Sequence, residues 1–338
     1  MSTKVLILGA NGFIGSSLSE YILEHTDWDV YGLDLSHHKL DQCIGHQRFH
    51  FTEGDMLIHK EWVEYHVKKC DVVLPLVAIA TPATYVKDPL RIFELDFEAN
   101  LEVVRWCAKY NKHVIFPSTS EVYGMCEDDA FDEESSNFIN GPINKPRWIY
   151  SNSKQLMDRV IHALGEKDGL NYTLFRPFNW IGGRQDEVFN IKEGGARVLT
   201  QFISNIIHGR DIQLVDGGEQ RRCFTYIDDG IEALARIIEC RDSSANRQII
   251  NIGNPENNHS IKELAEVLLT EIKKYDQYKA QADKVRVTIT QSDRYYGEGY
   301  QDVKARIPAI DNAKKYLNWQ PKTDFVTAIQ KTLAYHLA

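Results

Sequence analysis

The stretch KVLILGANGFIG, residues 4–15, decides the fold of this chain. An apolar run typical of a buried strand leads directly into a turn with glycines at positions 9, 12 and 15, and a helical pattern follows. Glycines permit a tight turn and let backbone N–H groups approach a pyrophosphate at the start of a helix. The turn therefore predicts a dinucleotide site, built from Gly9, Asn11, Gly12, Phe13, Ile14 and Gly15.

An acidic residue ends the next predicted strand, DVYGLDL at residues 29–35. Asp34 follows Gly15 by about 20 residues, the spacing at which a carboxylate holds a ribose 2′-hydroxyl. A carboxylate there also repels a 2′-phosphate, which favours NAD over NADP. A simple strand-end turn residue is the weaker interpretation. Asp55 is suited to the adenine amino group, although an ordinary loop aspartate explains it almost as well.

Short apolar runs alternate with amphipathic helices up to about residue 178, which predicts an α/β fold with a Rossmann-type, doubly wound parallel sheet. Beyond residue 179 the pattern loosens into Gly-rich and polar loops, so we expect a smaller C-terminal α/β substrate lobe. The predicted division is an NAD-binding domain at 1–178, with a return segment at about 224–252, interleaved with a sugar-nucleotide lobe at 179–338. Predicted strands lie at 4–8, 29–35, 71–77 and 113–116, and predicted helices at 13–25, 89–110 and 148–164.

The composition narrows the class of partner. The 338 residues carry a net charge of −9, which disfavours nucleic acid and anionic membrane surfaces. Because the whole chain is negative, an anionic substrate would need a binding site in which arginines and lysines are gathered. No apolar run approaches the roughly 20 residues of a membrane helix, and a strand beginning at residue 4 leaves no room for a signal peptide. The six cysteines lack metal-ligand spacing, so we expect free thiols, no metal and a cytoplasmic protein.

Tyr150 and Lys154 carry the first chemical signal. Their spacing of four places both side chains on one face of a helix. A lysine ammonium lowers the pKa of a nearby tyrosine, and the tyrosinate can take a proton from an alcohol while hydride leaves to NAD⁺. Thr119, in the hydroxyl-rich segment PSTSEVYG at residues 117–124, would hydrogen-bond the same substrate oxygen.

Glu121, in the same segment, is not needed for alcohol oxidation. It marks either an additional step, as a general base or proton relay, or a glutamate that pairs with a neighbouring arginine. The position alone does not separate these interpretations. Arg221 and Arg222, in DGGEQRR, form either a solvated pair or a diphosphate contact, and we favour binding for Arg222 because guanidinium matches phosphate geometry.

The glycine spacing, the Ser/Thr strand end and the Tyr-x-x-x-Lys pair together resemble the extended short-chain dehydrogenase/reductase family. Five further stretches narrow the resemblance: NKPRWIYSNSKQLMDR, FRPFNWIGGR, LVDGGEQRRCFTYIDDGIEA, INIGNPEN and YYGEGYQDVKARIP. They are similar to the UDP-glucuronic acid decarboxylases that form UDP-4-keto-pentose, a family that includes the C-terminal domain of bifunctional polymyxin-resistance enzymes. The resemblance covers essentially the whole chain. The formyltransferase half of those enzymes is missing from it, so we expect a free-standing decarboxylase.

The resemblance implies NAD-dependent oxidation at C4 of UDP-glucuronic acid, followed by loss of CO₂ from the β-keto acid. It also implies a homodimer formed through helices near 91–110 and 148–164. The implied catalytic residues are Thr119, Ser120, Glu121, Tyr150, Lys154 and Arg306. The implied NAD contacts include Asp34, Asp55 and Met56. The implied substrate contacts are Ala80, Tyr85, Arg147, Asn179, the stretch 213–222 with Gln213 and Arg222, and Tyr300.

Several alternatives remain open. A UDP-xylose synthase would reduce the ketone again in the same site, and no residue decides between release and re-reduction. Ring contraction is disfavoured because the similar UDP-apiose synthases carry cysteines at the positions of Ala80 and Ser120. A 4-epimerase or 4,6-dehydratase suits Glu121 and Arg306 less well. A non-catalytic NAD sensor is disfavoured because Tyr150 and Lys154 are both intact.

Overall fold

The computed structural model describes residues 2–191, 196–297 and 301–338. Its centre is a parallel sheet of seven strands in the order β11-β6-β5-β4-β1-β2-β3. The strands are β1 (Lys4–Leu8), β2 (Asp29–Asp34), β3 (Phe49–Glu53), β4 (Val72–Pro75), β5 (His113–Pro117), β6 (Tyr172–Pro177) and β11 (Gln248–Ile252). The predicted fold class, a doubly wound Rossmann-type sheet, is confirmed.

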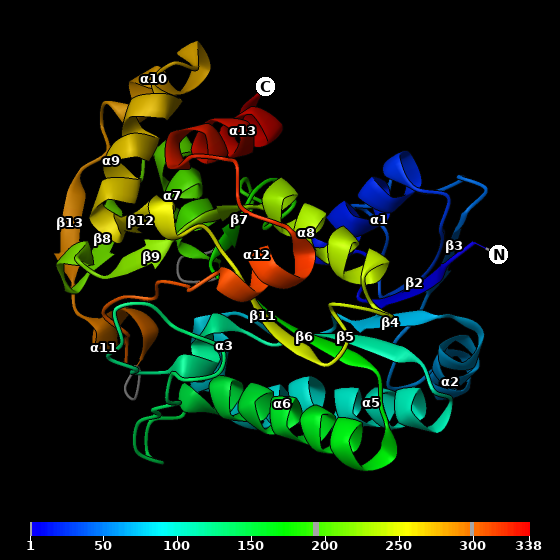
Figure 1. Ribbon diagram of the computed structural model, residues 1–338. Helices are drawn as coiled ribbons and strands as arrows, with labels where there is room; N and C mark the ends of the chain where they lie inside the picture. Colours follow the sequence, from blue (N-terminus) through cyan, green and yellow to red (C-terminus); the bar gives the residue numbers. More distant parts are fainter. Residues whose placement is uncertain (1, 192–195, 298–300) are drawn as a thin grey trace.

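Helices cover both faces of this sheet (Figure 1). Helices α1 (Phe13–His25) and α8 (Ile227–Glu239) pack on one face, against Val5 and Ile7 of β1. Helices α2 (Lys60–Lys69), α5 (Asn100–Lys109) and α6 (Trp148–Asp168) pack on the other, against Leu6 and Leu8. Successive side chains of a strand point to opposite faces, so a continuously apolar strand is buried on both sides.

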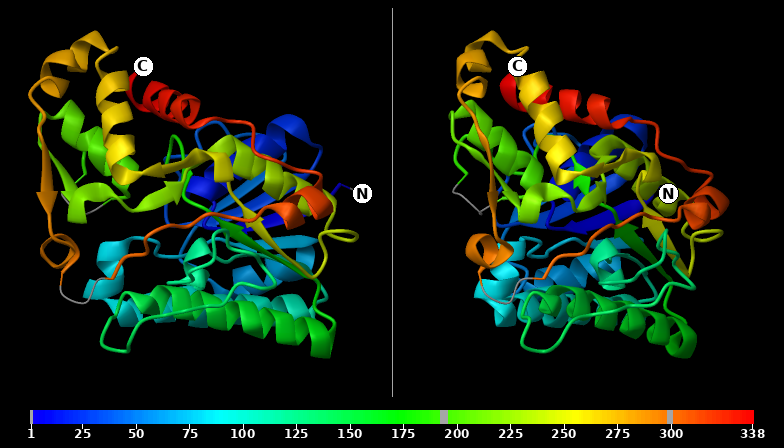
Figure 2. Two further views of the ribbon diagram at one scale, coloured as in Figure 1. Left: turned by 60° about the vertical axis from the view of Figure 1, so that its left-hand side comes forward. Right: turned by 90° about the vertical axis from the view of Figure 1, so that its left-hand side faces the viewer.

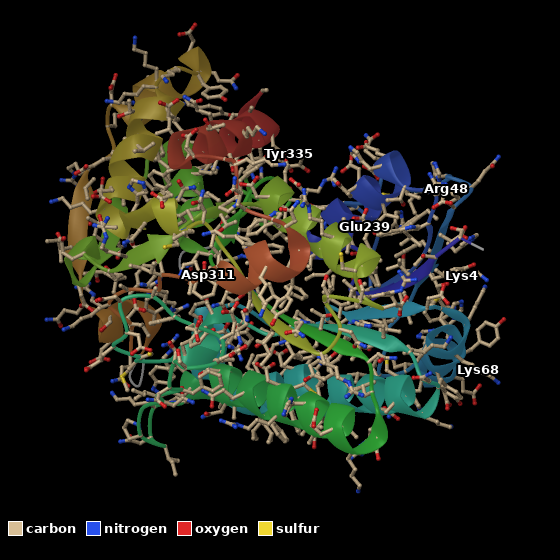
Figure 3. The ribbon with its side chains drawn as sticks, viewed as in Figure 1. Lys4, Arg48, Lys68, Glu239, Asp311 and Tyr335 are labelled. Atoms are coloured by element: carbon tan, nitrogen blue, oxygen red, sulfur yellow. The ribbon has the colours of Figure 1, made fainter. Side chains whose placement is uncertain are left out.

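A second group of elements lies beyond the carboxyl end of the sheet (Figure 2). The apolar side chains of α7 (Val198–Ile207), α9 (Ile261–Ile272) and α13 (Phe325–Leu337) join the same core as α1 and α8. Strand β8 (Ile212–Val215) pairs with β13 (Val287–Thr290), β9 (Arg221–Cys223) with β12 (Asn258–Ser260), and β7 (Trp180–Ile181) with β10 (Thr225–Tyr226). Lys4, at the amino end of β1, lies on the side away from this group (Figure 3).

The remaining elements are short. They are α3 (Pro82–Lys87), α4 (Pro89–Phe93), α10 (Asp276–Ala282), α11 (Ser292–Tyr296), α12 (Asp311–Leu317), the 3₁₀ turns η2 (Ser120–Tyr123), η3 (Asp216–Gly218) and η4 (Pro255–Asn257), and the π-helical turn η1 (Glu94–Ala99). None of the helices within the described ranges is long and apolar enough to span a membrane.

The helix predicted as continuous over 89–110 is interrupted. It consists of α4, the π turn η1 and α5. The wider turn is held by Asn100, whose side-chain amide donates to the carbonyl oxygens of Val77, Leu95 and Asp96. π turns of this kind are frequent at functional sites. The spacing of apolar residues in the sequence did not reveal the π turn. An α-helical turn and a π turn, which is one residue longer, give similar spacings over so short a segment.

Candidate active site

The turn after β1 has the geometry of a nucleotide-binding loop. Gly9 has a φ of +87°, which L side chains rarely adopt. A Cβ on Gly15 would overlap the carbonyl oxygen of Gly9, so α1 can start this close to the turn only with glycine there. The Gly12 N–H donates to the Gly9 carbonyl at 3.1 Å, and α1 begins at Phe13 and Ile14. The N-terminal end of α1, with its partial positive charge, is therefore presented to a phosphate.

Asp34 lies directly beside this turn. Its Oδ2 accepts a hydrogen bond from the Asn11 N–H at 2.8 Å, and its Oδ1 accepts one from the Leu35 N–H at 2.7 Å. Burial raises the pKa of Asp34, which the backbone donors partly offset. The Asn11 side chain also holds the loop after β2, because its Oδ1 accepts from the Lys39 N–H at 2.7 Å. The glycine turn and the acid are thus held together, as an NAD site requires.

The hydroxyl-rich segment lies at the carboxyl end of β5, and α6 passes beneath it. Thr119 is the N-cap of η2, and its hydroxyl accepts from the Glu121 N–H at 3.2 Å. Ser120 is buried. Lys154 is also buried and donates to the carbonyl oxygen of Pro117 at 2.9 Å. This bond ties the lysine to the strand that presents Thr119.

Tyr150 lies one helical turn before Lys154, with the Lys154 Nζ 5.9 Å from its ring centroid. Burial raises the pKa of the Tyr150 hydroxyl well above its usual value, and the charges of Asp96 and Glu121 raise it further. The Thr119 hydroxyl works in the opposite direction by hydrogen bonding to it. The sequence predicts a pKa lowered by Lys154. In the structure the pKa of Tyr150 is instead raised, because burial is the largest influence on it, and the Tyr85 ring stacks on Tyr150 with ring centroids 4.7 Å apart.

Glu121 joins two arginines that come from distant parts of the chain. Its Oε2 accepts from Arg147 Nη2 at 2.8 Å, and its Oε1 lies 3.3 Å from Arg306 Nη1. Arg147 is 1% exposed and Arg306 6% exposed. The ion-paired alternative for Glu121 therefore describes this state of the protein. The two guanidinium groups lower the pKa of Glu121 despite its burial.

A second ion pair lies in the same cluster. Arg222 Nη2 donates to Asp302 Oδ1 at 2.6 Å, and Arg222 Nη1 donates to the carbonyl oxygen of Val303 at 2.9 Å. The arginines lower the pKa of Asp302. Within the described part of the chain, three guanidinium groups thus face the two carboxylates of Glu121 and Asp302, which leaves one positive charge. Arg306 Nε is buried and has no hydrogen-bond partner among the described residues.

The other predicted contacts are spread over several loops. Tyr85 is buried in α3, whereas Ala80 is exposed in the loop before it. Asn179, with a φ of +43°, follows β6, and Gln213 lies in β8. Asp55 and Met56 follow β3, where the Asp55 carboxylate accepts from the Leu57 N–H at 2.8 Å. Tyr300 lies outside the described residues.

Two acids near the site, the half-buried Asp302 and the buried Asp96, were missed by sequence reasoning. Asp302 pairs with Arg222, and its only sequence signal is a position four residues before Arg306. Asp96 lies in η1, and nothing in the helical pattern distinguishes it from its neighbours. Among the described residues, no cluster of histidine, cysteine and acidic side chains could hold a metal ion.

A family model described as the NAD dependent epimerase/dehydratase family matches residues 5–253. The chain belongs to this family. NAD is accordingly its cofactor, and the glycine turn with Asp34 is the part of the chain that fits it.

Solved structures of this family are similar over nearly the whole chain. The PbgP3 protein from Burkholderia pseudomallei is 54% identical, with a TM-score of 0.90 over 99% of this chain and 96% of that one. A UDP-N-acetylglucosamine 4-epimerase from Methanobrevibacter ruminantium is 25% identical, with a TM-score of 0.82 over 99% and 98%. A UDP-glucuronic acid 4-epimerase from Bacillus cereus, in complex with UDP-glucuronic acid and NAD, is 22% identical, with a TM-score of 0.80 over 98% of each chain. The last of these supports the fold alone.

Proposed function

We propose that this protein oxidises and decarboxylates UDP-glucuronic acid, giving UDP-4-keto-pentose and CO₂. The observation that supports this most is the buried cluster in which Glu121 lies between Arg147 and Arg306. Glu121 is two residues from Thr119, whose hydroxyl hydrogen-bonds Tyr150. A cluster with excess positive charge beside the alcohol-oxidising pair suits a sugar that carries a carboxylate next to its reacting carbon.

The oxidation step uses Tyr150, Lys154 and Thr119. Tyr150 removes the proton of the C4 hydroxyl, and Thr119 holds the same oxygen by a hydrogen bond. NAD, held by the glycine turn and Asp34, would supply the hydride acceptor for this step. Lys154, fixed on the Pro117 carbonyl, supplies the positive charge that stabilises the tyrosinate.

Loss of CO₂ then follows from the chemistry of the product. A ketone at C4 lies β to the carboxylate carbon, so the electrons of the breaking bond flow into an enolate. Thr119 and the protonated Tyr150 donate hydrogen bonds to the enolate oxygen and stabilise its charge. Arg147 and Arg306 hold the carboxylate in position before it leaves.

Glu121 gains its role when the substrate binds. A substrate carboxylate that enters the arginine pair shares their charge, so the pKa of Glu121 rises toward that of an ordinary or higher carboxyl group. Glu121 can then relay the proton that C5 receives after CO₂ leaves. Arg306 orients a water molecule for this step, because a guanidinium group does not give up its own proton.

We assign the sugar nucleotide to the loops around this centre. In this proposal Ala80, Tyr85, Asn179, Gln213 and Arg222 contact the sugar nucleotide. Tyr300 supplies its hydroxyl to the carboxylate or the phosphates. Arg222 is paired with Asp302 in the structure, so it must give up part of that ion pair to bind the diphosphate. Ser120 lies at the strand end beside Thr119 and Glu121.

Mixing the purified protein with UDP-glucuronate and excess NAD⁺ tests the proposal. We expect stoichiometric NADH by absorbance and a UDP-4-keto-pentose by mass spectrometry. UDP-xylose without net NADH would replace ketone release with re-reduction in the same site. UDP-galacturonate would identify a 4-epimerase. No reaction with UDP-glucuronate would overturn the substrate assignment and leave the family and its cofactor intact.

A further inference from the structure

The buried carboxylate of Asp96 is not used by the reaction described above. Asp96 is fully buried in the π turn η1. Its Oδ1 accepts a hydrogen bond from the Ile79 N–H at 2.9 Å. Its Oδ2 is also buried and has no hydrogen-bond partner in the described ranges. A buried carboxylate oxygen without a partner is costly, so a compensating charge is expected nearby.

That charge is the ammonium of Lys154. Helix α6 packs against η1, and Ile79 belongs to the small apolar cluster that contains Tyr150 and Tyr85. Lys154 acts on Asp96 more strongly than any other charged group, and Asp96 in turn acts most strongly on Lys154. Asp96 is therefore on the same side of α6 as the two catalytic residues.

Other charged groups among the described residues also face Lys154 and Tyr150. Asp158 also faces Lys154, but it accepts from Ser118 Oγ at 2.6 Å and pairs with Arg176 Nη2 at 3.3 Å. Its charge is thus largely balanced by Arg176. Tyr150 is faced by Asp96, Glu121 and Arg197, with the Thr119 hydroxyl in hydrogen-bonding contact. Among the described residues, only Asp96 offers Lys154 a carboxylate on which no other cation acts.

We propose that Asp96 is a positioning residue that keeps the buried Lys154 in its charged form. Burial alone favours the neutral amine, and a neutral Lys154 could not stabilise the tyrosinate of Tyr150. The π turn serves this purpose by carrying the Asp96 carboxylate to the Lys154 side of α6. The inference rests on the alcohol-oxidation half of the proposed function, and not on the identity of the sugar.

Asp96→Asn tests the proposal, because the amide keeps an acceptor for Ile79 and removes only the charge. We expect the acid limb of the pH profile of kcat for NADH formation to move to higher pH by at least about one unit, which is about tenfold in rate near neutral pH. KM should stay within about twofold. Burial raises the pKa of Asp96 to about 6, so the two proteins should converge below that pH. The matched control is Glu98→Gln, an exposed acid in the same turn.

The sign of the shift decides the outcome. If Lys154 stays charged without Asp96, the substitution only removes a negative charge that raises the pKa of Tyr150, and the acid limb moves to lower pH. A shift to lower pH overturns the proposal, and so does an unchanged profile. UDP-glucuronate is the probe, with UDP-glucose used if it is not oxidised. A second readout needs no sugar: the ultraviolet absorption of tyrosinate in the NAD⁺-saturated protein, measured against Tyr150→Phe. The tyrosinate should appear at higher pH in Asp96→Asn, and an unchanged titration contradicts the proposal even if UDP-glucuronate is not the substrate.

Discussion

At the scale of single residues, the proposed reaction depends on how Glu121 shares two arginines. In the structure its charge is balanced by Arg147 and Arg306, and they hold the pKa of its carboxyl group below the usual range. A carboxylate in that state is a weak base. The substrate carboxylate must therefore displace Glu121 from the arginines before Glu121 can accept or donate a proton. Substrate binding is thereby coupled to decarboxylation.

Glu121→Gln separates binding from decarboxylation. The amide keeps the shape of the side chain but holds no charge and relays no proton. We expect the KM for UDP-glucuronate to change by less than about threefold, because the freed arginines still bind the carboxylate, while the rate of CO₂ release falls by about 100-fold. Steady-state kinetics of CO₂ release measure both. Glu127→Gln, at an exposed acid, is the control. Full activity of Glu121→Gln would remove this residue from the mechanism.

At the scale of elements, the β1–α1 turn is the most tightly constrained part of the nucleotide site. A methyl group on Gly15 would overlap backbone atoms of Gly9 and Ala10, and backbone cannot move aside as a side chain can. Gly15→Ala should lower the free energy of unfolding by about 1–3 kcal/mol, as overpacking of a core does. It should also weaken NAD⁺ binding by pushing α1 away from the turn.

Denaturant unfolding and calorimetric titration with NAD⁺ measure these two effects. Ser17→Ala in the same helix adds no atoms and serves as the control. Unchanged stability together with unchanged NAD⁺ affinity would show that the turn has more room than its geometry indicates.

The elements also show where sequence reasoning succeeds and where it stops. The helix predicted over 13–25 agrees with α1, because glycines fix its start and an apolar face fixes its length. Strand β3 was not predicted, since FHFTE is short and alternates at the sheet edge with little apolar content. The arginine cluster depends on contacts between residues more than 150 positions apart, such as Glu121 with Arg306. No local pattern contains that pairing, and only the resemblance brought Arg306 into the site.

At the scale of the whole molecule, one buried acid links the loop after η2 to the sheet. Glu133 Oε1 accepts from the Asn251 N–H in β11 at 2.7 Å. Burial raises the pKa of Glu133 from its usual 4.5 to about 7. The folded state therefore binds more protons than the unfolded state between these values, so the stability contributed by Glu133 falls as the pH rises through this window.

Glu133→Gln should remove this dependence, because the amide oxygen still accepts from Asn251 and carries no charge. From about pH 5 to about pH 8, the natural chain should lose up to about 3 kcal/mol of unfolding free energy relative to the variant. Urea titrations at several pH values measure the difference, and Glu134→Gln, at the exposed neighbour, is the control. Parallel stability curves for the natural chain and Glu133→Gln would mean that the buried acid ionises without cost.

The face formed by α5 and α6 concerns the assembly of the molecule. The two helices run side by side beneath the sheet (Figure 1). Leu156 of α6 is 46% exposed, and Trp106 of α5 and Val160 of α6 are partly buried. A homodimer through this face stays a prediction.

The central claim is that the arginine cluster serves a carboxylate that leaves as CO₂. UDP-glucuronate labelled at its carboxylate carbon tests this most directly, with release of labelled CO₂ followed in the presence of NAD⁺. We predict that label is lost in step with oxidation, and that Tyr150→Phe abolishes both. Oxidation or epimerisation of the sugar with the label retained in the nucleotide product would contradict it.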